Sequence, residues 1–502
     1  MTVKVIGHPS VADRRAEGAD ARIQTPPSLH TGWVPAGDRP DPVALLEEQN
    51  ATRDEDLVPV RHGRMLVSPF TFYRGAAKIM ATDLAGTPTA GLTTQLCGDA
   101  HLSNFGVYAS PERELVFDVN DFDETLPGPF EYDVKRMAAS FTIAARNNGL
   151  TTAESVAATQ AVVRAYRETM AQFAQMRVME RWYARMSATD IEAALAKVVA
   201  AGNGAVRATK PGKKAKAGKG SKPGKVAGKA QPDSVRRAVE QAEKNLRKAH
   251  TRDSLQALSK LGELVDGHYR IVSQPPIVVP LRDLKELYGM TAGDVEKAVH
   301  DQFREYRSTL QDDRRHLLEQ FEVIDVARKV VGVGSVGTRA SIVLLQGRDA
   351  QDPLFLQVKE ATRSVLEGHL PKSRYRNPGE RVVRGQRMMQ ATSDIYLGWT
   401  KGVQANRYLY WRQLRDMKGS AVIEGMQAVG LNFYAGMCGW TLARSHARAG
   451  DPVAIAAYLG AGDDFDLSIT DFSQRYAEQN EKDYEAFAAA VKSGRIPAVE
   501  GI

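Results

Sequence analysis

The chain has 502 residues, 43% of them hydrophobic and 25% charged, which is the balance of an ordinary globular protein. No run of about 18 apolar residues occurs, so we expect no membrane-spanning helix, and the first residues lack the apolar core of a signal peptide. Two cysteines, Cys97 and Cys438, are too few for a disulfide framework or a cysteine-rich metal site. The simplest expectation is a cytoplasmic protein with more than one lobe.

The net charge of +7 comes from one segment. Residues 203–230 contain nine Lys and Arg and no acid, so removing them leaves a net charge of −2 for the rest of the chain. The segment is a near-repeat of Lys, Gly, Ala and Pro, which predicts disorder. Residues 205–230 could bind nucleic acid weakly and without sequence preference, although such a run is often only a solvated loop.

The N-terminal part is expected to be irregular, with little regular structure before the first strand. Residues 1–60 are rich in Pro, Asp and Arg and predict one short helix at 42–50. Residues 61–96 predict a strand-like piece followed by a helix that carries Arg74 and Lys78. Arg74 is a candidate for contact with phosphate or substrate, or for a structural ion pair.

The remainder predicts helices first, then strands, then helices again. Helical patterns occupy residues from 134, 153–186, 189–200, 234–250, 254–265 and 294–321, and again from 421 onward. Strands are expected at 105–108 and 115–119 as a hairpin, at 271–281 as an extended stretch, within 321–359, and at 395–400 and 408–414. This pattern predicts an α+β protein with a large helical lobe and a smaller antiparallel β lobe. Its expected parts are residues 1–60, 61–320, 321–420 and 421–502.

The densest group of chemically competent side chains surrounds the hairpin at 105–119. Asp and Asn residues often only stabilise turns and cap helices, but so many metal-competent groups in one hairpin favour a site. Carboxylates and an amide suit a hard cation such as Mg²⁺, with one carboxylate left to accept a proton. The group comprises Asp99, His101, Asn104, Asp118, Asp121, Asp123 and Glu124.

Five members of this group have an expected role in the chemistry. Asp99 would accept the proton of an attacking hydroxyl, and Asn104, five residues later, would bind Mg²⁺. Asp121 would bind the metal that bridges the phosphates, and Asp118 and Asp123 compete with it for that role.

Two further residues are expected to order the loop. His101 fits a hydrogen-bond donor within the catalytic set better than a chemical base. Asp133, directly before a helical pattern, fits a helix cap or a brace for the site.

A second motif lies more than 200 residues later. Gly332, Gly334 and Gly337 fit G-x-G-x-x-G, but a strand follows them instead of the helix of a dinucleotide-binding fold. A glycine-rich turn between strands, followed by Lys359 on the next strand, is the arrangement with which kinases hold phosphates. An ordinary glycine hairpin and a surface lysine are the alternatives. Glu380 is the preferred partner for Lys359 on a helix, with Glu367 as the other candidate.

The motifs together resemble the protein-kinase-like superfamily, especially its aminoglycoside and choline phosphotransferase branch. Gly98-Asp99, His101 and Asn104 match the catalytic segment of that branch, and Asp121-Phe122 matches its metal-binding Asp-Phe pair. Cys97 replaces the first histidine of the motif. At finer grain, RPDPVALLEEQ, LVPVRHGRM, CGDAHLSNFG, FDVNDFDETLPGPFEYDVKR and CGWTLARSHARAGD are similar to the bacterial family called domain of unknown function 2252.

The resemblance implies a two-lobed kinase-like fold in permuted order, since the glycine-rich turn follows the catalytic loop instead of preceding it. It implies an ATP- and Mg²⁺-dependent phosphotransferase that acts on an unidentified hydroxyl acceptor. The alternatives are a catalytically inactive nucleotide-binding scaffold and a nucleic-acid-associated protein. The sequence leaves open the acceptor, transfer of AMP instead of phosphate, and the oligomeric state.

Overall fold

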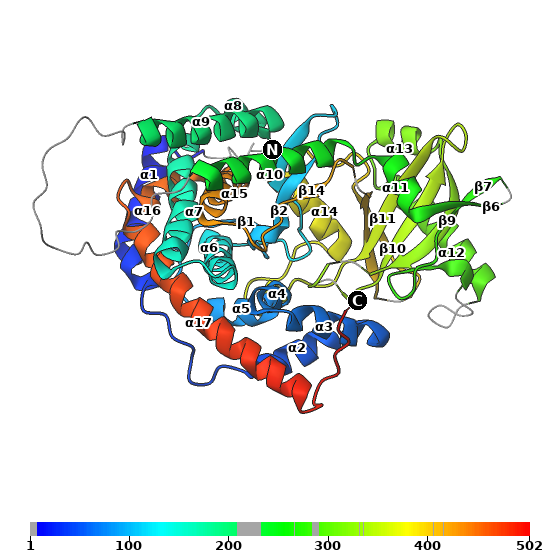
Figure 1. Ribbon diagram of the computed structural model, residues 1–502, viewed down its shortest axis with the longest axis horizontal. Helices are drawn as coiled ribbons and strands as arrows, with labels where there is room; N and C mark the ends of the chain where they lie inside the picture. The colour runs from blue at the N-terminus through cyan, green and yellow to red at the C-terminus, as the bar shows by residue number, and fades with distance from the viewer. Residues whose placement is uncertain are drawn as a thin grey trace, which may run out of the picture.

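The computed structural model describes residues 8–207, 232–265, 267–283, 291–330, 332–334, 336–404, 406–414 and 416–501. A helical body occupies one side of the molecule and a twisted antiparallel sheet with flanking helices occupies the other (Figure 1). The protein is therefore α+β, as predicted. No helix within these ranges is both long and apolar enough to cross a membrane.

The N-terminal part is helical, which corrects the prediction of a strand within residues 61–96. Ser68 and Thr71 form a capping box at the start of the helix that contains Arg74, and Pro69 occupies its first turn. The aromatic residues that suggested a strand lie on this helix and are buried. Local capping and tertiary packing therefore override their β propensity. The elements are α1 (Val11–Gln24), η1 (Pro27–His30), α2 (Pro42–Asn50), η2 (Glu55–Leu57), α3 (Val58–Leu66), α4 (Pro69–Gly75) and α5 (Ala77–Ala85).

Five helices make the core of the helical body: α6 (Phe130–Asn147), α7 (Thr152–Phe173), α15 (Ala428–Ala449), α16 (Pro452–Leu459) and α17 (Asp464–Lys492). Nearly every residue of α6 is buried, so α6 is the central helix around which the others pack. Helix α15 lies against α7 so closely that a Cβ on Gly439 would come within 2.4 Å of the Val162 carbonyl oxygen. The C-terminal helices α15, α16 and α17 thus pack against α6 and α7, the segment that follows the hairpin.

A six-stranded antiparallel sheet has the strand order β12-β13-β11-β10-β9-β8. Strand β11 is buried on both faces: Leu356 and Val358 pack toward α12, and Phe355 packs toward α11. The strands are β8 (Val278–Pro280), β9 (Glu322–Lys329), β10 (Ala340–Gln346), β11 (Pro353–Glu360), β12 (Gly398–Lys401) and β13 (Tyr408–Gln413). The helices around them are α11 (Ser254–Leu261), α12 (Ala292–Ser308), α13 (Asp312–Leu318) and α14 (Pro378–Met389).

The predicted hairpin is present as β2 (Phe105–Ala109) and β3 (Leu115–Val119). It is the centre of a small sheet with β14 (Gly419–Ser420) on one side and β5 (Met186–Ser187) on the other. Nearby, β1 (Thr93–Leu96) pairs with β4 (Leu126–Pro129). Because β14 follows the large sheet in the chain, this pairing joins the hairpin to the sheet side of the molecule.

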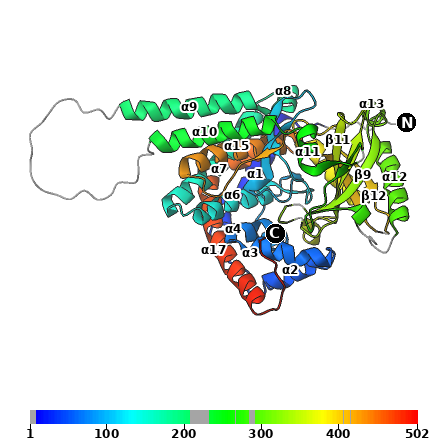
Figure 2. The same cartoon turned by 45° about the vertical axis from the view of Figure 1, so that its right-hand side comes forward.

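The remaining elements lie at the periphery. They are α8 (Val178–Tyr183), α9 (Ala188–Arg207), α10 (Pro232–His250), β6 (Gly262–Val265) and β7 (His268–Ile271), with short 3-10 turns at Leu102–Asn104, Leu281–Asp283 and Val365–Gly368. Helices α9 and α10 run side by side and project from the body (Figures 1 and 2). The lysine-rich segment predicted to be disordered lies between them, and apart from residues 203–207 in α9 it falls outside the described residues.

Candidate active site

The loop between β1 and β2 carries the proposed proton acceptor and is fixed in shape by its own backbone. Gly98 has φ +84°, and a Cβ there would lie 2.2 Å from the Glu124 carbonyl oxygen, so only glycine fits. Asp133, in the first turn of α6, accepts hydrogen bonds from the backbone N–H groups of Cys97 (2.8 Å) and Gly98 (3.0 Å). His446 Nε2, 3.2 Å from Asp133, joins this brace.

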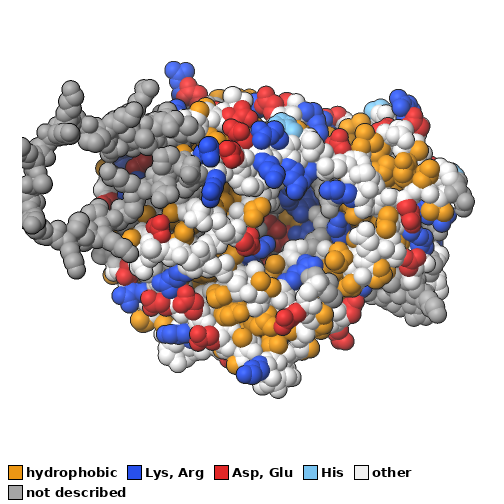
Figure 3. Space-filling model, viewed as in Figure 1, with side chains coloured by type: hydrophobic (Ala, Val, Ile, Leu, Met, Phe, Trp, Pro, Cys, Tyr) orange, Lys and Arg blue, Asp and Glu red, His pale blue; other side chains and the backbone are white. Residues whose placement is uncertain are grey.

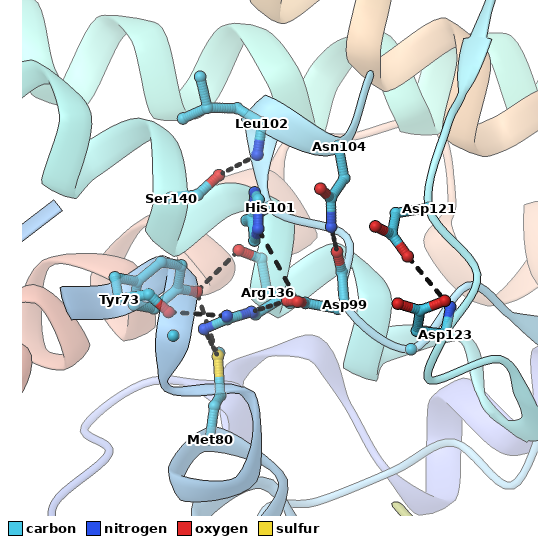
Figure 4. Close-up of polar contacts among 12 residues, drawn as sticks. Tyr73, Met80, Asp99, His101, Leu102, Asn104, Asp121, Asp123, Arg136 and Ser140 are labelled. Carbon is cyan, nitrogen blue, oxygen red and sulfur yellow. Dashed lines mark hydrogen bonds and ion pairs between the residues drawn. The ribbon is translucent and has the colours of Figure 1, made fainter. Parts of the chain in front are cut away.

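Asp99 points into the site from this loop, where Arg136 of α6 holds it (Figure 4). Arg136 Nε donates to Asp99 Oδ1 at 2.8 Å, and the Asn104 amide donates to the Asp99 carbonyl oxygen at 2.8 Å. Burial raises the pKa of Asp99, and Arg136 opposes that rise only in part. A carboxylate with a raised pKa is a better proton acceptor near neutral pH than an ordinary aspartate.

His101 lies beside Asp99, with its Nε2 3.8 Å from Asp99 Oδ2. Burial lowers the pKa of His101 well below its ordinary value, and the nearby charges of Arg136 and Arg74 lower it further. The ring is therefore neutral at physiological pH. Its backbone N–H donates to the Asp99 carbonyl oxygen at 2.9 Å, and its carbonyl accepts from Asn104 N at 2.8 Å, so His101 helps to shape the loop.

Lys359 of β11 meets the carboxylates that follow the hairpin. Its Nζ forms an ion pair with Asp123 and lies 3.9 Å from Asp121 Oδ2. Tyr410 of β13 also donates to Asp123, at 2.5 Å, and the Asp123 N–H donates to Asp121 Oδ1 at 3.1 Å. Burial alone would lower the pKa of Lys359, but the two carboxylates raise it above its ordinary value. Lys359 is therefore a buried, permanently charged lysine.

Two expectations from the sequence are corrected. Asp118, a candidate metal ligand, is 1% exposed and turned away from the site: it pairs with Arg444 and accepts from the backbone N–H groups of Val119 and Ala391. Its oxygens are thus occupied by structural contacts. Glu380, the expected partner of Lys359, instead pairs with Arg384 at 3.4 Å on α14, and the ion pairs of Lys359 go to the hairpin carboxylates.

The glycine-rich turn lies against the N-terminal helices. Gly332 and Gly337 have φ values of +69° and +85°, and Gly334 would bring a Cβ to 3.1 Å from the Arg74 carbonyl oxygen. The Gly337 carbonyl accepts from Asp54 N at 2.8 Å, and the Gly332 carbonyl accepts from Arg64 at 2.5 Å. Residues before the hairpin therefore hold this turn over the site.

A cavity of about 760 Å³ joins these features. Of the residues predicted from the sequence, Asp99, His101, Asn104, Asp121, Asp123, Gly332 and Gly334 line it, and Lys359 lies behind Asp123. The space-filling view shows a hollow between the helical body and the sheet, with Lys and Arg side chains around acidic ones (Figure 3). Gly337, Glu380 and Asp118 are not on its wall.

Sequence reasoning missed one residue of this cavity region, Arg136, and gave another, Glu124, no role. Arg136 was overlooked although it lies three residues after Asp133, a spacing that puts both on one face of α6. Glu124 lines the cavity and accepts from Val365 N at 2.7 Å, and burial raises its pKa to about 7. Neither could be distinguished from structural charges without the fold.

The oxygen-bearing side chains on the cavity wall suit a hard cation that is also bound by water and substrate. Groups of three or more His, Cys, Asp or Glu side chains arranged for a metal are not found among the described residues. Asp121, Asp123 and Asn104 nevertheless share one cavity wall. Mg²⁺ is commonly held by one or two carboxylates together with water and substrate phosphates, so two carboxylates and an amide are sufficient.

Comparison with known proteins gives one match. A family model described as "Uncharacterized protein conserved in bacteria (DUF2252)" matches residues 53–218 and 212–490. No curated protein and no solved structure matches the chain. The matched ranges contain every residue of the cavity discussed above.

Proposed function

The chain belongs to the bacterial family called domain of unknown function 2252, and we propose that it is an ATP- and Mg²⁺-dependent phosphotransferase with a hydroxyl acceptor. One observation carries the proposal. Lys359 Nζ lies 3.9 Å from Asp121 although 238 positions separate them in the chain. Asp121 and the glycine-rich turn line the cavity, and Lys359 lies behind Asp123. A lysine, a metal-competent aspartate and a glycine-rich turn at one cavity are the parts that phosphoryl transfer needs.

The sheet supports a kinase-like arrangement in permuted order. The glycine-rich turn connects β9 and β10, and Lys359 lies on β11, so the lysine is on the third of three consecutive antiparallel strands, as in kinases. In this proposal α14, between β11 and β12, corresponds to the helix that supplies the lysine's partner. Here Asp123 takes that role, because the carboxylate of α14 faces Arg384.

Three residues would hold the metal: Asp121, Asp123 and Asn104. Bound Mg²⁺ would neutralise charge on the β- and γ-phosphates. The Asn104 amide nitrogen is already used by the Asp99 carbonyl, so its oxygen is the atom left for a cation. Lys359 adds a positive charge that does not titrate near neutral pH, and the backbone of the glycine-rich turn can approach phosphate closely because its glycines carry no side chain.

Asp99 would act on the acceptor. The hydroxyl proton passes to an Asp99 carboxylate oxygen as the hydroxyl oxygen bonds to the γ-phosphorus, and the bond between that phosphorus and the β,γ-bridging oxygen breaks to release ADP. Arg136 holds the carboxylate in place with its hydrogen bond of 2.8 Å. Most of the rate enhancement of such a reaction comes from positioning and charge neutralisation.

The test combines binding and turnover. Isothermal titration of the wild-type protein with ATP and Mg²⁺ should show binding that Lys359→Met weakens, because the lysine charge is lost. Transfer from γ-labelled ATP across a panel of hydroxyl compounds should fall by about 10²- to 10⁴-fold in Asp99→Asn, with ATP affinity retained. Arg384→Gln, a substitution on the outer face of α14, is the matched control.

Two results would contradict the proposal. If the wild-type protein does not bind ATP, ATP cannot be the phosphoryl donor and the proposal fails. Binding without turnover across the panel would favour the inactive scaffold. A parallel series with α-labelled ATP distinguishes transfer of AMP from transfer of phosphate.

A further inference from the structure

One wall of the cavity carries an arginine that makes no hydrogen bond or ion pair with any described residue. Arg74, near the end of α4, lines the cavity, and its Nε is buried without a hydrogen bond. Its guanidinium has no hydrogen bond or ion pair within the described part of the chain, in contrast to Arg136, which pairs with Asp99. Burial lowers the pKa of Arg74, and the charges of Glu424 and Asp99 offset that effect only in part. A half-buried guanidinium with no hydrogen-bonded partner fits a site for an anionic ligand.

Arg53 provides a second donor on the same wall. It precedes α3, lines the cavity, and donates to the Val336 carbonyl beside the glycine-rich turn, while its Nε is buried without a partner. Its side chain lies against Gly337, and the backbone of Arg74 lies against Gly334. The two arginines thus flank the turn.

Glu124, Asp123 and Glu360 act on the charge of Arg53, but none of them forms an ion pair with it among the described residues. Glu48 pairs with Lys78 at 2.6 Å, and Glu360 pairs with Arg407. Asp99, the nearest acid of the hairpin to influence Arg74, has its own arginine in Arg136. At the rim, Arg363 and Lys372 are exposed and add positive charge that would attract an anion.

We propose that Arg74, assisted by Arg53, binds a phosphate or carboxylate group carried by the acceptor. This assignment to the acceptor rests on the proposed phosphotransferase function; the anion site itself does not. Arg74 is close enough to Asp99 and His101 for its charge to affect both. An acceptor hydroxyl must lie within hydrogen-bond reach of Asp99, so an anion held by Arg74 belongs to the molecule that presents that hydroxyl.

The proposed nucleotide site has a positive charge of its own. Lys359 of β11, together with a cation held by the hairpin carboxylates, would serve the phosphates of ATP. Arg74 comes instead from α4, and Arg53 from the turn between α2 and η2. The acceptor is therefore inferred to be a small acidic hydroxyl compound, such as a sugar phosphate or a hydroxy acid, and not a neutral alcohol.

The experiment uses inorganic phosphate as the probe, titrated into the full chain at constant ionic strength with and without a saturating non-hydrolysable ATP analogue and Mg²⁺. Wild-type protein should bind phosphate in both conditions. Arg74→Gln should weaken phosphate binding by about 10- to 100-fold, the value of one or two charge-assisted hydrogen bonds, and leave the affinity for the ATP analogue unchanged. Arg53→Gln should weaken it less, and Arg384→Gln not at all.

Arg74→Lys is the control for misfolding. It keeps the positive charge, so it should retain part of the affinity for phosphate. Three results would overturn the proposal: no phosphate binding by the wild type, equal binding by Arg74→Gln, or loss of phosphate binding when the ATP analogue is present, which would put the anion at the γ-phosphate position. If phosphate binds through Arg74 but ATP does not bind at all, the anion site stands and the phosphotransferase proposal fails.

Discussion

Asp118 and Asp123 lie five residues apart in one hairpin and have opposite surroundings. Asp118 is 1% exposed and has a saturated set of partners: Arg444, two backbone N–H groups and, at 3.5 Å, the Tyr108 hydroxyl. Asp123 is 27% exposed, pairs with Lys359 and lines the cavity. The first belongs to a sealed interior behind the hairpin and the second to the open cavity in front of it.

The difference teaches that a charge is recognised as structural or chemical by its surroundings and not by its residue type. Every oxygen of Asp118 has a donor and its side chain is 1% exposed, whereas Asp123, whose oxygens also have donors in Lys359 and Tyr410, lines the cavity. In the cavity, Asp121 and Asp123 share their lysine and face a volume of about 760 Å³. The predictions below test how complete this division is.

The largest effect should come from removing the sealed charge. Asp118→Asn leaves the buried Arg444 without its counter-ion, which should lower the free energy of unfolding by about 3–5 kcal/mol. Asp123→Asn should cost only about 1–2 kcal/mol, because Asp121 remains 3.9 Å from Lys359 to compensate its charge. Urea unfolding of both variants measures the two values.

In ligand binding, the order of the two variants should be reversed, with the larger loss of affinity in Asp123→Asn. Asp123→Asn should weaken binding of ATP and Mg²⁺, whereas any folded Asp118→Asn protein should bind them normally. Equal losses of unfolding free energy in the two variants would contradict the division between the sealed region and the cavity.

A second buried acid should make stability depend on pH. Glu131, in the first turn of α6, is fully buried, and its Oε1 accepts from Ala90 N at 2.6 Å while its Oε2 has no partner. Burial raises its pKa to about 7. The native state then binds more protons than the unfolded state between about pH 4.5 and 7, so this group's stabilisation is complete below that range and is lost as pH rises through it.

Glu131→Gln should therefore reduce the loss of stability between pH 5 and 7, by up to about 1.4 kcal/mol per pH unit. The measurement is the free energy of unfolding in urea at several pH values. Glu478→Gln, at an exposed position on α17, is the control and should leave the slope unchanged. An unchanged slope in Glu131→Gln would mean that this acid is ionised in the folded protein over the whole range.

Local patterns predicted the elements but not the long-range partners. The hairpin and the buried helix α6 follow from short apolar runs and from helical spacing, which are properties of neighbouring residues. The strand expected within residues 61–96 failed because the Ser68–Thr71 capping box outweighed the aromatic residues beside it. From the sequence, proximity of Lys359 to the hairpin could be predicted only by assuming a permuted fold.

The partners of individual charges were less accessible to sequence. Asp121 was preferred as the metal ligand, but Asp118 stayed a competitor. Strand β3 is buried on both faces, so alternation along the strand does not mark which side is sealed. Glu380 was preferred as the partner of Lys359 because its segment has a helical pattern. That pattern does not reveal which face of the helix points toward the lysine. Arg74 could be named as a candidate, whereas the absence of an ion-pair partner is visible only in three dimensions.

A smaller loss of stability than that of Asp118→Asn should come from Asp133, which belongs to both regions. Its side chain is buried with His446, yet it holds the loop that presents Asp99. Asp133→Asn replaces one acceptor oxygen by a donor, so one of the two loop N–H groups, at Cys97 or Gly98, loses its partner. Unfolding free energy should fall by about 1–2 kcal/mol. If the loop positions the base, the rate of phosphoryl transfer should fall more than tenfold while ATP affinity stays constant, because the nucleotide contacts come from other elements. A variant that loses stability but keeps its rate would show that Asp133 serves only the sealed interior and that the Asp99 loop holds its shape through Gly98 and Arg136 alone.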